Sequence, residues 1–78
     1  MKVKEVKVID NMQMILTFVS GEKRLFDASS LLSFPVFQSL KNKDIFNNLE
    51  IDHGVVTWDN GKIDIAPETM YQQSFEYN

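Results

Sequence analysis

Residues 55–68 read Val55-Val56-Thr57-Trp58-Asp59-Asn60-Gly61-Lys62-Ile63-Asp64-Ile65-Ala66-Pro67-Glu68. Two runs of alternating apolar and polar residues flank the Asn60-Gly61 pair. This pair is the strongest short-range signal of a β-hairpin, because both central residues of a type I′ turn need a positive φ. Pro67 has no N–H to give to a sheet and suits the first turn of a helix. The stretch therefore predicts a strand, a tight turn, a second strand and a closing helix.

The only tryptophan of the chain, Trp58, lies in the first strand of this predicted hairpin. Its alternation with Val56 favours a place in the core, and an exposed position at a protein interface is the alternative. Replacing a buried tryptophan by alanine typically costs about 3–5 kcal/mol. We therefore expect Trp58→Ala to remove most of the stability of so small a domain.

Residues 1–27 predict a three-stranded antiparallel meander. Residues 3–9 are rich in β-branched side chains, and residues 10–11 suit a tight turn. Ser20-Gly21 predicts a second turn, and residues 22–26 predict the third strand. The middle strand is indicated by apolar residues that recur at period two, which are Met12, Met14, Leu16 and Phe18.

The chain between the meander and the hairpin predicts short helical turns. Asp27 or Ser29 can cap the first turn, and Pro35 suits the start of the next. The apolar face of that second turn is predicted to consist of Val36, Phe37 and Leu40. Residues 1–78 are therefore expected to form a single α+β domain. Its small, mostly antiparallel sheet, built from the N-terminal meander and the C-terminal hairpin, is covered by short helices.

Composition excludes several classes of function. The chain has no cysteine, which removes disulfides, thiolate metal sites and a cysteine nucleophile. It has no run of roughly 20 apolar residues, the length needed to span a bilayer, and no N-terminal signal segment. We therefore expect a cytoplasmic protein that does not bind membranes. The net charge of −3 disfavours general binding to nucleic acid.

The charge is also uneven along the chain. Residues 1–43 hold seven Lys and Arg against four acids, whereas residues 44–78 hold one lysine against seven acids. This difference either sets up complementary faces in a dimer or is evened out by a fold that interleaves the two halves. The lysines near the N-terminus are Lys2, Lys4 and Lys7. They form either a docking patch or an ordinary charged edge that discourages aggregation.

Three blocks of the sequence carry a resemblance to a known family. The first joins Ser20-Gly21-Glu22 to Leu25-Phe26-Asp27, the second runs from Pro35 to Leu40 with Phe46 after it, and the third runs from Val56 to Tyr71. Together they resemble the bacterial domain-of-unknown-function family 2442. The resemblance implies a small α+β domain with a mostly antiparallel sheet and assigns no activity.

The same resemblance bears on partners. Some relatives carry a helix-turn-helix segment, and others are encoded beside small partner proteins in arrangements that suggest toxin–antitoxin pairs. The sequence ends soon after Tyr71, so we expect no DNA-binding extension and no direct contact with nucleic acid.

Two groups of residues have side chains that could take part in catalysis or metal binding. His53, the only histidine, is expected to be an exposed turn residue without an orienting partner, because neighbours in a strand point to opposite faces. Asp59, Asp64 and Glu68 would form a hard-oxygen site for Mg²⁺ or Ca²⁺ if they met at one end of the sheet. The alternative is that these three are ordinary turn, strand and helix-start residues. A hydrolase built on them is the third functional hypothesis, behind the two that follow.

The sequence favours a non-enzymatic protein-interaction module that pairs with itself or with a small protein encoded nearby. A role as the antitoxin-like member of a two-gene pair follows from the resemblance alone. Open sheet edges and surplus aromatic residues motivate this hypothesis. The aromatic residues expected at the interface are Phe34, Phe37, Phe75 and Tyr77. The alternative is a small-molecule-binding domain with an aromatic-lined pocket. No cofactor and no catalytic residue are expected.

Overall fold

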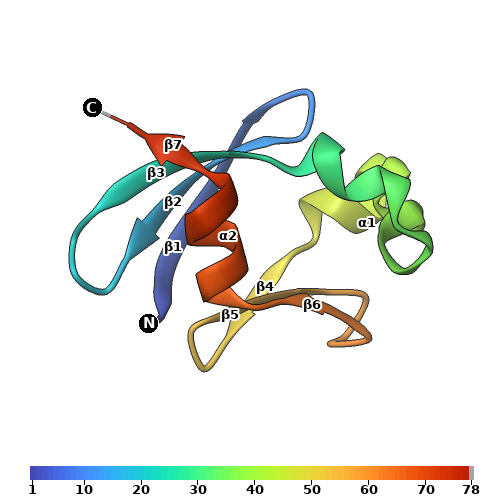
Figure 1. The fold of residues 1–78 in the computed structure, drawn as a ribbon. Helices are drawn as coiled ribbons and strands as arrows, with labels where there is room; N and C mark the ends of the chain where they lie inside the picture. Colours follow the sequence, from blue (N-terminus) through green and yellow to red (C-terminus); the bar gives the residue numbers. More distant parts are fainter. Residues whose placement is uncertain (78) are drawn as a thin grey trace.

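The computed structural model describes residues 1–77, which form two antiparallel sheets connected by short helical segments (Figure 1). The strands are β1 (Val3–Asp10), β2 (Gln13–Phe18), β3 (Lys23–Asp27), β4 (Glu50–Asp52), β5 (Val55–Trp58), β6 (Ile63–Ile65) and β7 (Phe75–Glu76). The helical segments are the 3₁₀ helices η1 (Ala28–Ser33) and η2 (Pro35–Lys41) and the α-helices α1 (Lys43–Asn47) and α2 (Pro67–Gln73). The predicted α+β class is confirmed. The prediction of one sheet built from the meander and the hairpin was wrong, because no strand of the hairpin pairs with a strand of the meander.

The first sheet has the strand order β1-β2-β3-β7, so the predicted meander is confirmed and gains a fourth strand. Its inner face buries Met14, Leu16 and Phe18, which alternate along β2 as expected. The first turn was predicted one residue too early. A bulge between Val8 and Asp10 shifts the register, so the turn falls on the two residues after Asp10, both with positive φ.

The second sheet has the order β4-β5-β6 and contains the hairpin that we expected around Asn60-Gly61. Trp58 pairs with Ile63, so the connection has four residues, and the predicted two-residue turn was wrong. Asp59, Asn60 and Gly61 all have positive φ, at 53°, 56° and 85°. Their backbone closes two overlapping turns, since the N–H of Gly61 donates to the Trp58 carbonyl at 3.1 Å and that of Lys62 to the Asp59 carbonyl at 3.1 Å.

Trp58 lies in the core, as predicted, with 1% of its surface exposed. Its ring stacks on Phe46 of α1 with a centroid distance of 6.1 Å. The indole Nε1–H donates to the Phe46 carbonyl at 3.1 Å, so the one polar atom of the ring is paired. This contact attaches α1 to the second sheet.

Helix α2 begins at Pro67, as predicted, and buries Met70 completely. Its C-terminal end is tied to β3 by Arg24, whose Nε donates to Ser74 Oγ at 2.7 Å and whose Nη2 donates to the Ser74 carbonyl at 2.8 Å. The Arg24 guanidinium also lies 4.1 Å from the centre of the Tyr71 ring. The Tyr71 hydroxyl donates to Glu22 at 3.0 Å. This network positions the chain that continues into β7.

The helical segment at residues 35–41 begins at Pro35 as expected, but it is a 3₁₀ helix. A 3₁₀ helix has three residues per turn, so residues i and i+3 share a face. Phe37 and Leu40 therefore point inward, with Leu40 1% exposed, whereas Val36 is 62% exposed. The predicted apolar face was wrong at Val36 for this reason.

The two sheets are joined directly near the N-terminus. The N–H of Val3 in β1 donates to the carbonyl of Gly54, in the turn between β4 and β5, at 2.9 Å. Gly54 has a φ of 84°, and a Cβ at this position would lie 2.5 Å from the Cβ of Lys2. Glycine is therefore required here for both its backbone conformation and its lack of a side chain.

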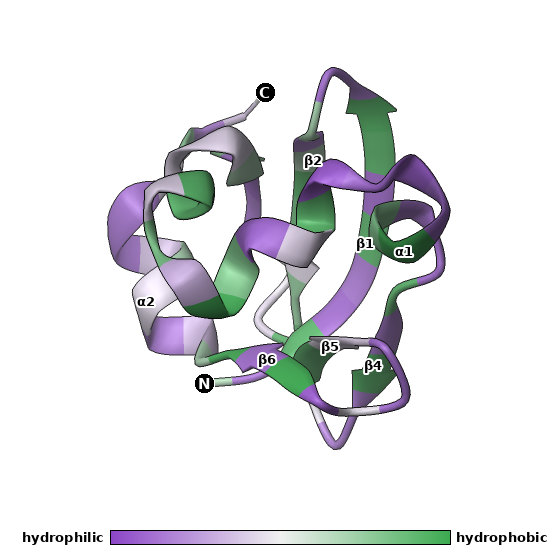
Figure 2. Ribbon diagram, turned by 90° about the vertical axis from the view of Figure 1, so that its right-hand side faces the viewer, coloured by the Kyte–Doolittle hydropathy of each residue, from purple (hydrophilic) through white to green (hydrophobic). Residues whose placement is uncertain are grey.

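Figure 2 shows hydrophobic and hydrophilic residues alternating along β1, as expected for a strand with one buried face.

Within residues 1–77, no helix has both the length and the apolar character that a membrane crossing requires.

Candidate functional site

The four aromatic residues expected at an interface fall on two different surfaces. Phe34 and Phe37 lie where η1 meets η2, with Phe34 54% exposed and Phe37 half-buried. Phe75 and Tyr77 lie at the β7 edge of the first sheet, 70% and 40% exposed. The structure therefore does not bring the four together.

The first surface is a groove of about 320 Å³ between the 3₁₀ helices and α2, here called the helical groove. Its lining residues are Leu31, Phe34, Val36, Phe37, Asp64, Ile65, Ala66, Thr69 and Gln73. Phe34 precedes Pro35 and has extended backbone, as the proline ring demands of the residue before it. Its side chain is therefore not part of either helix face and remains at the rim of the groove.

The second surface is a row of side chains across the outer face of the first sheet, here called the β7 row. Residues directly opposite in neighbouring strands share a face, and the register aligns Lys7, Ile15, Leu25 and Phe75. Ile15 and Leu25 have strands on both sides and are half-buried, whereas Phe75 has β3 on one side only. Tyr77 continues this edge, since its N–H donates to the Lys23 carbonyl at 3.2 Å.

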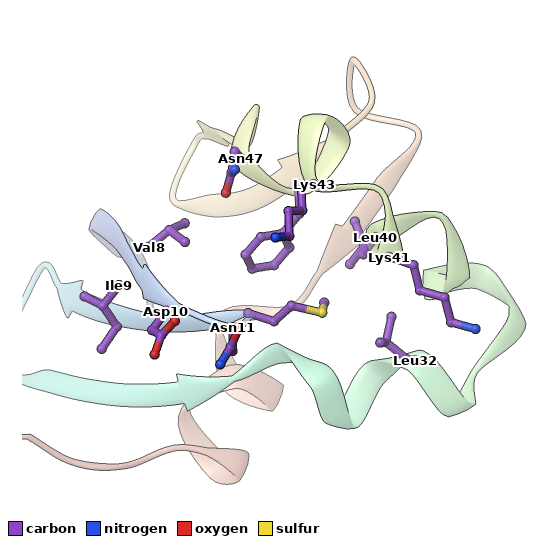
Figure 3. Close-up of a pocket in the computed structure, with 11 residues that line it drawn as sticks. Val8, Ile9, Asp10, Asn11, Leu32, Leu40, Lys41, Lys43 and Asn47 are labelled. Carbon is purple, nitrogen blue, oxygen red and sulfur yellow. The ribbon is translucent and has the colours of Figure 1, made fainter.

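A third surface was not foreseen from the sequence. It is a groove of about 500 Å³ between the end of β1 and the segment η2–α1, here called the β1-edge groove (Figure 3). Its apolar lining comes from Val8, Ile9, Met12, Leu32, Leu40 and Phe46, and its polar lining from Asp10, Asn11, Lys41, Lys43 and Asn47. The two sides are about 30 residues apart in sequence, so no local pattern could have shown that they meet.

The carboxylates considered for a metal site lie on three separate elements. Asp59 lies in the hairpin turn, Asp64 in β6 and Glu68 in the first turn of α2, and all three are exposed. Within residues 1–77, no group of three or more His, Cys, Asp or Glu side chains is arranged to hold a metal ion. Glu68 instead lies near the positive end of the α2 dipole, and Asp64 borders the helical groove.

His53 is an exposed turn residue, as expected, with 92% of its side chain accessible. Its Nδ1 lies 2.7 Å from Oδ1 of Asp52. We expected these neighbours to point apart, but His53 has a φ of 51°, and this turn conformation brings its ring back to Asp52. A side-chain contact this exposed adds little to stability because water competes with it.

The N-terminal lysines do not form one patch. Lys2 precedes β1 and lies against Gly54, Lys4 occupies a bulge, and Lys7 points from the outer face opposite Ile15. All three are exposed, and none lies within ion-pair distance of a carboxylate in residues 1–77. Lys4 and Lys7 lie on the edge strand β1, and Lys2 lies directly before it.

One tyrosine has a shifted pKa. The hydrogen bond to Glu22, followed by desolvation, raises the pKa of Tyr71 above its usual value of 10.0, and Arg24 opposes this rise. Tyr71 packs edge-on against Phe18 with the ring centres 5.5 Å apart, so the group is part of the packed structure. Its surroundings favour the neutral phenol and do not resemble those of an activated base.

The chain belongs to the family described as protein of unknown function (DUF2442), whose sequence profile matches residues 3–76. Searches of the curated proteins and of the solved structures returned no match.

Proposed function

We propose that this DUF2442 member is a non-enzymatic module that binds another protein chain through the helical groove. The observation that carries the proposal is the exposure of Phe34 and Val36, at 54% and 62%, on the rim of a groove whose floor includes Phe37. Adjacent exposed apolar residues beside a concave surface are typical of binding sites. Aromatic side chains are also enriched among the residues that contribute most to interfaces.

The partner is a second copy of this chain or a small protein encoded nearby. A segment that places an apolar side chain between Phe34 and α2 would remove apolar surface from water, at about 25 cal/mol per Å². Asp64 borders the same groove, so a cationic residue beside that apolar side chain would be complementary. An antitoxin-like role is the specific form of this proposal if the partner is a toxin.

The test compares two variants that lose exposed apolar surface in different places. Phe34→Ser combined with Val36→Ser alters the helical groove, whereas Val19→Ser removes a valine that is 65% exposed and lies outside it. Mass would be measured in solution up to about 500 µM, and binding to the product of the neighbouring reading frame by calorimetry.

We expect the groove variant to lose self-association or partner binding by about tenfold or more, and Val19→Ser to retain it. A wild-type chain that stays monomeric and ignores the neighbouring product would overturn the proposal. Equal binding by both variants would place any interface elsewhere.

The alternative, a small-molecule site, draws on the same groove. Its volume of about 320 Å³ lies at the lower end of the range for ligand pockets, roughly 300–1,000 Å³. A thermal-shift screen with metabolites separates the two, because a ligand that binds only the folded chain raises the melting temperature. A hit that is abolished by Phe34→Ser and retained in Val19→Ser would favour the small molecule.

A further inference from the structure

The β1-edge groove combines an apolar floor with cations at its rim. Leu40 and Phe46 in the lining are buried, and Val8, Met12 and Leu32 are half-buried. Lys41 and Lys43 are exposed beside them, and within residues 1–77 neither lies within ion-pair distance of a carboxylate. Asp10 is the one acid in the lining, so positive charge predominates locally in a chain whose net charge is −3.

The same groove borders an unpaired sheet edge. β1 is a terminal strand of its sheet, and its one backbone bond to the chain beyond that sheet, among the described residues, is that of Val3 to Gly54. Bulges interrupt the strand between Val3 and Glu5 and between Val8 and Asp10. The regular stretch Glu5–Val8 is therefore short, and bulges of this kind discourage open-ended strand association while leaving a few backbone groups accessible.

We propose that this edge binds an extended acidic peptide segment of a partner protein, which adds a strand to β1 and continues into the β1-edge groove. Backbone hydrogen bonds to residues 5–8 would give affinity, as in other cases of strand addition. An apolar side chain would cover Phe46 and Leu40, and a carboxylate would pair with Lys41 or Lys43. In Figure 3 both lysines lie on the side of the groove opposite Val8 and Ile9.

Charge selects this occupant over others. A second copy of the chain is less suited. Its own β1 brings no net negative charge, because Lys4 and Lys7 balance Glu5 and Asp10. Its other terminal strands, β4, β6 and β7, are two or three residues long, too short to pair with residues 5–8 and also reach the groove. A basic peptide is also less suited, because Lys41 and Lys43 at the rim of the groove would repel it. The proposal concerns a different surface from the helical groove and does not depend on it.

The test uses labelled eight-residue peptides in which valine alternates with glutamate, glutamine or lysine. Fluorescence polarisation measures affinity, and amide chemical shifts of the ¹⁵N-labelled protein locate binding. We expect the glutamate peptide to bind best, and to shift the amides of residues 5–8 and of Lys43. Raising the salt from about 0.05 M to about 0.5 M should weaken it, because the lysines are exposed to solvent.

Two changes separate the parts of the proposal. Lys41→Glu with Lys43→Glu should weaken the glutamate peptide by about tenfold or more. Lys23→Glu with Lys62→Glu, which reverses two exposed lysines outside the lining of this groove, is the matched control and should have little effect. Methylating the backbone nitrogen of every second peptide residue removes the N–H donors along one edge of the extended peptide. Either the odd-numbered or the even-numbered residues face β1, so methylation of one of these two sets should abolish binding.

Equal affinity for the glutamate and lysine peptides, or shifts confined to the helical groove, would overturn the inference. Loss of binding in the lysine variant counts only if its circular dichroism spectrum and melting temperature match those of the wild type. If that variant unfolds, the peptide series on the wild-type protein still decides the outcome.

Discussion

Trp58 and Phe75 are both large aromatic residues in short strands, and they have opposite surroundings. Trp58 in β5 has β4 and β6 on either side and α1 above it, and is 1% exposed. Phe75 in β7 has only β3 beside it and is 70% exposed. The neighbours of a strand therefore decide whether its aromatic residue stabilises the fold or remains available for binding.

The largest expected loss of stability comes from removing the side chain of Trp58. Trp58→Ala should lower the free energy of unfolding by about 3–5 kcal/mol, because it leaves a cavity against Phe46 and an unpaired carbonyl. A domain of this size has about 4–12 kcal/mol in total. Urea unfolding should be followed by circular dichroism, since the variant has no tryptophan. A loss below about 1 kcal/mol would mean that Trp58 is not a core residue.

The next largest loss of stability is expected when Arg24 can no longer hold Ser74, the residue directly before β7. Arg24→Met should cost about 1–3 kcal/mol, because Ser74, which is 6% exposed, loses both hydrogen bonds from the guanidinium. The neighbouring Lys23→Met, on an exposed residue, is the control and should change stability by less than about 0.5 kcal/mol. Hydrogen exchange of the Tyr77 amide should accelerate in the first variant. Unchanged exchange would show that Arg24 does not hold this edge.

A smaller effect is expected at Phe75 itself. Phe75→Ser should change the free energy of unfolding by less than about 0.5 kcal/mol, because most of the ring is already in water. The measurement is urea unfolding followed by Trp58 fluorescence. A loss of 2 kcal/mol or more would contradict the comparison by showing that the β7 row contributes to the core.

The smallest effect is a titration. In a Tyr77→Phe background, absorbance at high pH reports Tyr71 alone, and its pKa should lie above 10.0. The folded state favours the protonated phenol, so the associated stability is complete below about pH 10 and is lost as the pH rises through the raised pKa. Glu22→Gln should lower this pKa, since the bond to Glu22 is the main cause of the shift. An unchanged pKa would assign the shift to burial.

The sequence was informative where neighbouring residues decide the structure. Asn60-Gly61 reversed the hairpin, Pro67 began α2, and the alternation along β2 identified its buried face. Prediction from the sequence failed where residues far apart in the chain decide the structure. β7 exists because Phe75 pairs with Leu25, fifty positions earlier, and a two-residue strand has no periodicity of its own.

The candidate surfaces also differ in how much of each could be predicted from neighbouring residues in the sequence. Phe34 was expected at an interface only as one of the surplus aromatic residues, and the structure leaves 54% of it exposed. Val36 was misplaced because the sequence does not distinguish a 3₁₀ helix from an α-helix, and the two differ in which residues share a face. The β1-edge groove was missed because its lysines and its strand edge meet only in the folded chain.

The pairing of β7 with β3 has a consequence for how the chain is made. During synthesis, at roughly 5–20 residues per second, β1, β2 and β3 leave the ribosome first and their sheet stays one strand short. The guanidinium of Arg24 has no Ser74 to bind until that late residue has emerged. The first sheet is thus completed only after the second sheet and α2 have been translated, and a nascent chain stalled near residue 70 would expose the edge of β3 to any other strand in reach.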